Sequence, residues 1–497
     1  MTVFDLIALL LVLTAAFSWL NQRFVKLPPS IAILAMGLVS STLLILLELA
    51  LPDVALYEQL ADLVKRVDFQ TTVLDGMLAF LLFAGSLHVN VSTLRARLAV
   101  VGAMAVAGTI MSTLIVGVAL WTVSLVLHIG LPLAWALVFG ALISPTDPVA
   151  VLATLKTVDV PAELETDMAG ESLFNDGIGV VLFTALLAVA SASANAEVGT
   201  FAFGELFVAE ALGGAMLGLA TGFFAYLAMR VIDDYPVEVL ISIALAMGCY
   251  SLASALHASG PIAVVVAGIF VGNRGPKDAL SDLTQRYLFG FWSLVDQILN
   301  SILFLLIGLE VLVLRFDIAF LPSALAAIPI AVGARLLATA SSIGVLRRWY
   351  RFHRGTVAVL VWGGLRGGIS IALALSLPET AWKPLLLSAT YCVVVFSILV
   401  QGLTLSRLAR TMFETQHQGS GRDPRGIVRG RQRSLRREDV ECRKRARLEL
   451  GEGTASLHRP PSYTNTSVAC SAADDPSTIG SGDGRRNSLF HRKKARY

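Results

Sequence analysis

Long apolar runs, separated by short polar and charged segments, dominate the chain up to about residue 410. Most of these runs are long enough to cross the hydrocarbon core of a bilayer as a helix, which takes about 20 residues. Continuous runs of this kind indicate helices, because barrel strands are shorter and alternate in polarity. We therefore predict an all-α polytopic membrane protein with about thirteen transmembrane helices, near residues 2–20, 30–51, 72–92, 98–122, 131–154, 165–190, 206–230, 237–256, 261–273, 287–314, 320–345, 355–377 and 384–406.

Two of the predicted spans contain residues that interrupt a helix. In the fifth span, Pro145 and Pro148 flank Thr146 and Asp147, and each proline lacks an N–H and clashes with the carbonyl four residues earlier. In the twelfth span, four glycines surround Arg366 in GGLRGG, and each glycine destabilises a helix by roughly 1 kcal/mol relative to alanine. One interruption in each half of the chain is typical of inverted repeats whose two discontinuous helices cross near mid-membrane. We expect these two segments to unwind and meet.

The charges at this crossing have two possible uses. Two partly positive helix N-termini face two partly negative C-termini there, and Asp147 is suited to offset the first pair and Arg366 the second. An acid within a membrane is also a candidate functional group in its own right. Asp147 is therefore a candidate both for this structural role and for ligation of an ion.

The sixth predicted span begins with the polar sequence GESLFNDG, which places several oxygen-bearing side chains on one helix. Ser172 and Asp176 are four residues apart and share a face. Glu171 and Asp176 project about 140° apart, so they need not form one paired-acid site. Asp176, Ser172 and the loosened backbone at Thr146 together supply the hard oxygen ligands that an alkali cation requires.

The second acid of this segment has a different expected use. Glu171 suits a buried arginine, and the chain offers both Arg335 and Arg366; removing one member of such a pair is strongly destabilising. Asn175 is neutral, so Asp176 is the one carboxylate here that is left to exchange a proton for a cation. Competition for Asp176, combined with alternating access of a domain that moves only when loaded, predicts obligatory one-for-one exchange.

The composition divides the chain near residue 410. The 497 residues are 55% hydrophobic and only 15% charged, whereas soluble proteins carry about a quarter charged residues. We expect a membrane domain over residues 1–410 and a disordered basic tail over residues 411–497, rich in Ser and Gly. The tail suits anionic inner-leaflet lipid, and nucleic-acid binding is not expected of a chain embedded in a membrane. The four cysteines have neither metal-site nor disulfide spacing, and no cofactor is expected.

The charges between the spans predict the orientation of the chain. When the N-terminus is placed outside and the spans alternate, thirteen Lys and Arg residues fall inside and four fall outside, namely Lys65, Arg66, Arg315 and Lys383. Cytoplasmic segments carry the excess of positive charge. We therefore expect the N-terminus outside and the C-terminus in the cytoplasm.

Two other classes of membrane protein use buried acids. An intramembrane aspartyl protease requires two facing acids that share a proton, and Asp147 and Asp176 lack the glycine-framed sequence context of those enzymes. A cation channel usually presents rings of equivalent carbonyls or acids, which a single free acid does not provide. The pattern favours a carrier over both alternatives.

Several segments, taken together and in order, resemble a known family: SPTDPVAV, GESLFNDGIGVVLF, FLLFAGSLH at 80–88, the arginine in GARLLA and GGLRGGIS. They resemble the monovalent cation:proton antiporter-1 family, the NhaP-like bacterial Na⁺/H⁺ antiporters related to animal sodium/hydrogen exchangers. The resemblance covers about residues 1–410. It implies thirteen helices arranged as a dimerisation domain and a six-helix core, and a homodimer in the plasma (inner) membrane that regulates intracellular pH and sodium.

The resemblance also implies roles for individual residues. Asp176 would bind either the proton or the cation (Na⁺, Li⁺ or K⁺), with Ser172 and the Thr146 backbone as further ligands. An Asn-Asp pair such as Asn175 and Asp176 marks electroneutral exchange in this family. The structural ion pair of the family corresponds to Glu171 with Arg335 rather than with Arg366.

One segment departs from the family pattern. Some archaeal relatives carry an acidic ligand in the third span, where this chain has the uncharged run Phe83–Leu87. Whether the third span contributes a ligand is therefore left open by the sequence.

Overall fold

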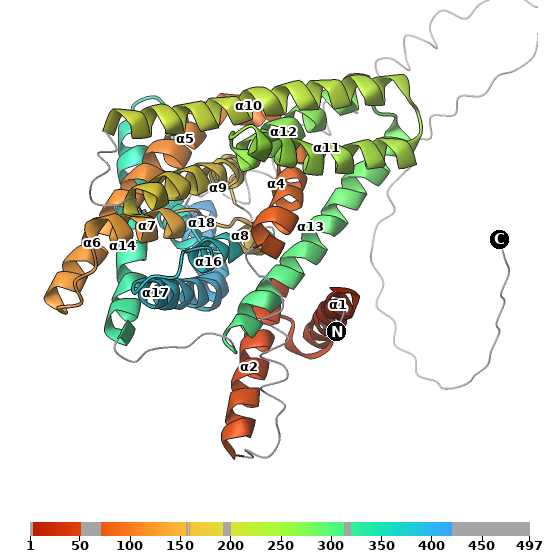
Figure 1. The fold of residues 1–497 in the computed structure, drawn as a ribbon. Helices are drawn as coiled ribbons and strands as arrows, with labels where there is room; N and C mark the ends of the chain where they lie inside the picture. The colour runs from red at the N-terminus through yellow and green to blue at the C-terminus, as the bar shows by residue number, and fades with distance from the viewer. Residues whose placement is uncertain are drawn as a thin grey trace, which may run out of the picture. The chain divides into compact units, whose positions relative to one another are not determined.

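The computed structural model describes residues 3–50, 71–155, 158, 160–191, 200–312 and 320–419, in which every regular element is a helix (Figure 1). Within these residues, nine helical segments are long and apolar enough to cross a membrane. The predicted all-helical membrane fold is therefore confirmed. The number thirteen stays a prediction, and residues 420–497, which make up most of the predicted tail, lie outside the described part of the chain.

The first half of the chain contains a series of α-helices in which three segments are π-helical, a form that adds a residue to one turn. In order these are α1 (Val3–Leu20), η1 (Asn21–Val25), α2 (Pro29–Ala50), η2 (Thr71–Met77), α4 (Leu78–Leu87), α5 (Val91–Gly102), η3 (Ala103–Gly108), α6 (Thr109–Val126), α7 (Leu133–Ile143), α8 (Val149–Leu155) and α9 (Ala162–Ser191).

The second half continues with further helices and one more π-helical segment. These are α10 (Thr200–Val231), α11 (Tyr235–Ala255), α12 (Gly260–Asp278), α13 (Asp282–Glu310), α14 (Leu321–Leu346), α15 (Thr356–Trp362), α16 (Gly368–Leu375), α17 (Lys383–Phe396), η5 (Ser397–Gln401) and α18 (Gly402–Gly419). The predicted domain boundary near residue 410 falls within α18.

Local sequence explains where several of these helices begin. The side chains of Asn90, Ser259 and Ser281 accept hydrogen bonds from backbone N–H groups in the first turns of α5, α12 and α13. Such caps satisfy donors that have no partner within the helix. The short predicted span 261–273 thereby extends to the 19 residues of α12.

Both predicted interruptions are confirmed. The fifth span is α7 and α8, separated by non-helical residues 144–148, and the twelfth is α15 and α16, separated by residues 363–367. In the first break the two prolines remove backbone donors. In the second the glycines lower helix propensity and, as described below, make room for neighbouring groups.

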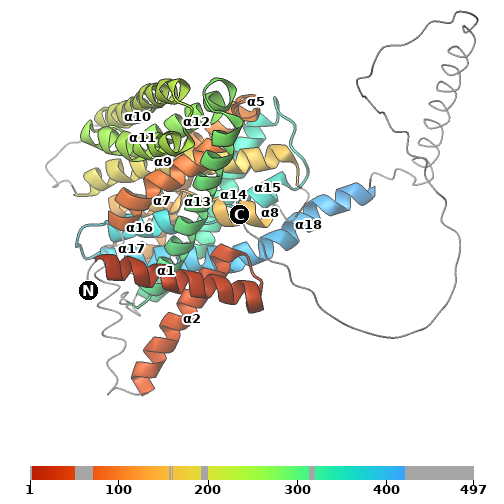
Figure 2. The same ribbon diagram turned by 90° about the vertical axis from the view of Figure 1, so that its right-hand side faces the viewer.

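The packing of the helices fixes their directions. Glycines of α10 lie against α12 in matching order, Gly214 at Ser259, Gly218 at Ala263 and Gly222 at Ala267, so these two helices run parallel. Figures 1 and 2 show α10, α11 and α12 side by side. Because only residues 279–281 separate α12 from α13, α13 runs in the opposite direction to α12.

The helix α9, which carries the candidate site, runs in the same direction as α13. Helix α4 runs parallel to α12. The chain turns at residues 88–90, so α5 runs in the opposite direction to α4, and α9 packs against α5 in a parallel orientation. The pairs that establish this are Ser86 with Gly268, Leu87 with Gly272, Val101 with Gly170, and Arg97 with Asp167.

Candidate cation site at the helix crossing

The two interrupted helices meet through both backbone and side-chain hydrogen bonds. The backbone N–H of Asp147 donates to the carbonyl of Leu365 at 2.7 Å. The buried guanidinium of Arg366 donates to the carbonyl of Ser144 and, at 2.9 Å, to that of Pro145. Arg366 therefore satisfies carbonyls that the end of α7 leaves without helical partners.

Side chains of α9 hold the first break in place at Thr146. The Ser172 hydroxyl donates to the Thr146 carbonyl, and the Asn175 amide donates to the Thr146 hydroxyl at 2.9 Å. A longer bond of 3.4 Å runs from the Thr146 N–H to the Asn175 side-chain oxygen. All three residues are buried. Asn175 thus contacts the unwound backbone directly, a role that sequence reasoning did not assign to it.

Asp176 lies one helical turn after Ser172 and is 7% exposed. Asp147, across the break, is close enough to act on it electrostatically. Among the described residues, no group of three or more His, Cys, Asp or Glu side chains could hold a metal ion. The oxygens near the crossing are those of the Asp147 and Asp176 carboxylates and the neutral groups of Thr146 and Ser172.

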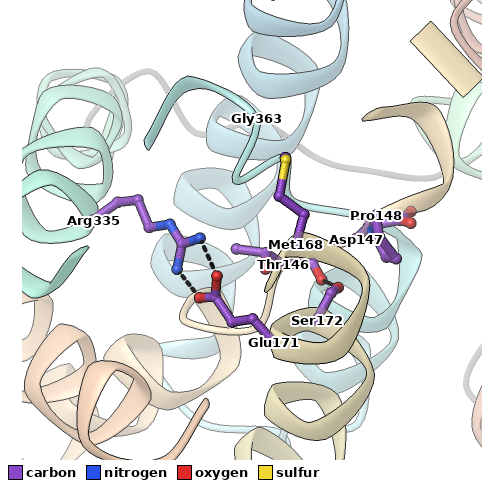
Figure 3. Close-up of a pocket in the computed structure, with 8 residues that line it drawn as sticks. All are labelled: Thr146, Asp147, Pro148, Met168, Glu171, Ser172, Arg335 and Gly363. Carbon is purple, nitrogen blue, oxygen red and sulfur yellow. Dashed lines mark hydrogen bonds and ion pairs between the residues drawn. The ribbon is translucent and has the colours of Figure 1, made fainter. Parts of the chain in front are cut away.

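Glu171, on another face of α9, is bound by Arg335 of α14 (Figure 3). Two guanidinium nitrogens contact its two carboxylate oxygens, one of them at 2.8 Å, and both residues are buried. Arg335 also donates to the carbonyl of Leu360 in α15 at 3.3 Å. Of the two arginines that the sequence offered, Arg335 is the one that contacts Glu171, while Arg366 binds the carbonyls of the first break.

A small cavity lies beside the crossing. It is lined by Thr146, Asp147, Pro148, Met168, Glu171, Ser172, Arg335 and Gly363, which Figure 3 shows converging from α9, α14 and both breaks. Asn175 and Asp176 are not among the lining residues. The cavity therefore reaches three of the four predicted oxygen ligands, Thr146, Asp147 and Ser172, but not Asp176.

A second ion pair on α9, in which Asp167 is buried and Arg97 partly buried, was missed by sequence reasoning. Arg97 of α5 donates to both carboxylate oxygens of Asp167, one at 2.8 Å, and its guanidinium lies over the rings of Tyr350 and Phe352 at 5.3 and 5.1 Å. Asp167 is four residues before Glu171 and shares its face. That spacing marks Asp167 as a candidate structural acid, but it does not identify Arg97 as its partner.

Comparison with known sequences finds similar proteins over most of the chain. The profile of the family described as "Sodium/hydrogen exchanger, transmembrane" matches residues 9–411. The Na⁺/H⁺ antiporter NhaP of Pseudomonas aeruginosa is 43% identical over 417 residues, covering 83% of this chain and 97% of that protein. The Na⁺/H⁺ antiporter NhaH of Halobacillus dabanensis is 37% identical, covering 78% of this chain and 93% of its own length.

A solved structure shares the fold. The sodium proton antiporter MjNhaP1 from Methanocaldococcus jannaschii, determined at pH 8, superposes with a TM-score of 0.62 and 17% sequence identity. The match covers 82% of this chain and 97% of MjNhaP1. The same overall fold is therefore compatible with widely different sequences.

Proposed function

Because the chain belongs to the sodium/hydrogen exchanger family, we propose that it is a secondary active antiporter that exchanges Na⁺ for H⁺ across the membrane it spans. The observation that carries this proposal is the crossing, where unwound backbone, a hydroxyl and a buried carboxylate come together on α9. Relatives in sequence are named as antiporters, and neither the protease nor the channel alternative is favoured.

In this proposal Asp176 binds either the cation or the proton, and Ser172 and the Thr146 carbonyl complete the cation's shell. The Ser172 hydroxyl already donates to Thr146, so both oxygens keep lone pairs directed elsewhere. Asn175 holds the Thr146 side chain and so keeps this carbonyl next to α9. Asp147 supports the site through its charge, either as a further ligand or by offsetting the helix N-termini.

The charges at the crossing favour one-for-one exchange. Glu171 and Arg335 form one opposite pair, and Asp147 and Arg366 contribute one charge of each sign. When all four are ionised they sum to zero, which leaves Asp176 as the uncompensated charge. Binding one Na⁺ or one H⁺ neutralises Asp176, so the loaded site crosses the low-dielectric membrane more easily than the empty one.

Several features of the assembly belong to the same proposal. We place the N-terminus outside and the C-terminus in the cytoplasm of the inner membrane, on the distribution of Lys and Arg residues. A homodimer and a role in sodium and pH homeostasis follow from family membership. The basic segment after residue 410 would contact anionic lipid on the cytoplasmic side.

Transport by the purified protein in liposomes tests the proposal. An imposed Na⁺ gradient should drive proton movement, and a K⁺/valinomycin potential should leave the rate unchanged. Asp176→Asn removes the titrating group and should abolish exchange, whereas Asp278→Asn, an exposed acid whose contact with Arg274 is 3.9 Å long, should retain it. Potential-driven uptake by the unmodified protein, or full exchange by Asp176→Asn, would contradict the proposal.

A further inference from the structure

Helix α13 carries polar side chains at mid-membrane that the crossing does not use. One face presents Asp282, Arg286, Ser293, Asp296, Gln297, Asn300 and Ser301. The polar face ends there, because every residue from Leu303 to Glu310 is buried. A helix that is amphipathic over its first two thirds and wholly enclosed afterwards contacts two different environments along its length.

The polar face is unsuited to lipid. Gln297 is exposed and Asp296 half-buried near the middle of the span, and such groups in hydrocarbon are strongly unfavourable. The apolar side of the same helix is also exposed, with Leu294 at 61% and Ile298 at 48%. These two sides fit different surroundings, hydrocarbon for Leu294 and Ile298, and water for Asp296 and Gln297.

Neighbouring helices contact α13 on both sides of Asp296 along the helix. Towards the start of α13, His88 of α4 packs on Phe289 and contacts the Ser293 hydroxyl at 3.4 Å. Two turns beyond Asp296, on nearly the same face, Leu303 contacts Gly368 at the start of α16. Figure 1 shows α13 running beside α4 and reaching α2 at its lower end. Asp296 thus lies on the face of α13 that is covered by α4 at one level and by α16 at the next.

This face leads to the crossing. Gly368 follows Gly367, and an ideal Cβ at Gly367 would lie 2.4 Å from the Asp147 carboxylate, so α13 and Asp147 are on either side of one short backbone segment. Asp296 and Asp176 each lie fourteen residues after the start of their helices, Asp282 and Ala162, or about 21 Å along the axis. Each carboxylate therefore lies near the middle of its own long helix.

We infer that the Asp296 carboxylate is a second binding site for the transported monovalent cation, on the route between the polar face of α13 and the crossing. Asn300 positions it, because its amide donates to the Asp296 carboxylate and carbonyl, both at 2.9 Å. The facing segment of α4, Phe83–Leu87, brings no charge to this space. A carboxylate there raises the local cation concentration and so acts on apparent affinity rather than on the exchange step.

This inference rests on the proposed function, and its test separates the two. Unmodified protein in liposomes must first show Na⁺/H⁺ exchange; if it does not, the proposed function fails. With exchange established, Asp296→Asn should raise the KM for Na⁺ about three- to tenfold, as expected for the loss of one charge beside the route of the cation, with maximal rate within twofold. Asp296→Glu should restore the KM to within about twofold, because it keeps the charge.

Ionic strength distinguishes an electrostatic site from a structural one. The KM difference between Asp296→Asn and unmodified protein should shrink when inert N-methylglucamine chloride is raised, since salt screens charges that contact water. Asp278→Asn, which removes an equal charge from an exposed position, should leave the KM within twofold. An unchanged KM in Asp296→Asn, an equal rise in Asp278→Asn, or a fall in maximal rate at constant KM would overturn the inference.

Discussion

The two interrupted helices stop in different ways, and the difference follows from what each contributes to the crossing. Residues 144–148 are broken by prolines, and this break supplies acceptors: the carbonyls of Ser144 and Pro145 bind Arg366. Residues 363–367 are broken by glycines, and this break supplies the donor side chain and the space. Ideal Cβ atoms at Gly367 and Gly364 would lie 2.4 and 2.7 Å from Asp147 and Arg335. Both breaks expose backbone groups that pair across the crossing, and the glycine break also permits close approach.

The two breaks are also anchored to α9 by different means. The proline break is held by neutral hydrogen bonds from Ser172 and Asn175 to Thr146. The glycine side is held by a charged pair, because Arg335 binds both Glu171 and the Leu360 carbonyl at the end of α15. Removing the charge should therefore affect the protein more than removing a proline, and three substitutions test that order.

The largest effect is expected from Glu171→Ala. It leaves the buried Arg335 charge without its partner, which lowers the free energy of unfolding by about 3–5 kcal/mol, and exchange should be lost with it. Denaturant-induced unfolding in detergent and liposome transport measure the two quantities. Glu163→Ala, an exposed acid in the first turn of the same helix, is the matched control and should change stability by less than about 1 kcal/mol. A fully stable but inactive Glu171→Ala protein would instead make Glu171 a direct participant in exchange.

An intermediate effect is expected from Gly367→Ala. The backbone of Gly367 is extended, with φ −116°, so alanine fits the conformation and only the contact with Asp147 is disturbed. Overpacking of this kind destabilises by about 1–3 kcal/mol, and exchange should fall at least about tenfold because the acid is displaced from the crossing. Gly333→Ala in α14, where no atom lies within 4 Å of the added Cβ, should preserve both properties. If the two variants had the same stability and exchange rate, close approach to Asp147 would be excluded as the reason for glycine at position 367.

The smallest effect is expected from Pro148→Ala. The first break is already fixed by the bond from the Asp147 N–H to Leu365 and by the bonds from Arg366. Pro148→Ala should therefore lower the free energy of unfolding by less than about 1 kcal/mol. Exchange should stay within twofold of the unmodified rate. A loss as large as that of Gly367→Ala would show that the proline, rather than the contacts across the crossing, keeps residues 144–148 unwound.

The breaks were predictable because prolines and glycines act through local backbone chemistry. Pro145 and Pro148 prevent regular helix bonding whatever surrounds them, and the glycines around Arg366 weaken the helix in the same local way. Helical periodicity likewise placed Glu171 and Asp176 on different faces. The roles of these residues in transport remain proposals.

What sequence could not provide was which groups meet between helices. Arg97 counted only as a positive charge between spans, because its contact with Asp167, seventy residues away, depends on how α5 packs against α9. Asn175 was read for its lack of charge, and its contact with Thr146 depends on where the broken helix lies. Asp296 went unnoticed since it is one acid in an otherwise apolar segment, and its significance depends on the direction of α13 and on its neighbours.

The bond between the Asp147 N–H and the Leu365 carbonyl has a consequence for how the protein tolerates variation. It joins the two halves of the chain through main-chain atoms alone, so no replacement at position 365 removes the acceptor. At position 147, proline is the one standard amino acid that removes the donor. An alanine scan would therefore not detect this link between the halves. Saturation mutagenesis should detect it, because the proline variant at 147 should lose more exchange activity than any other variant at that position.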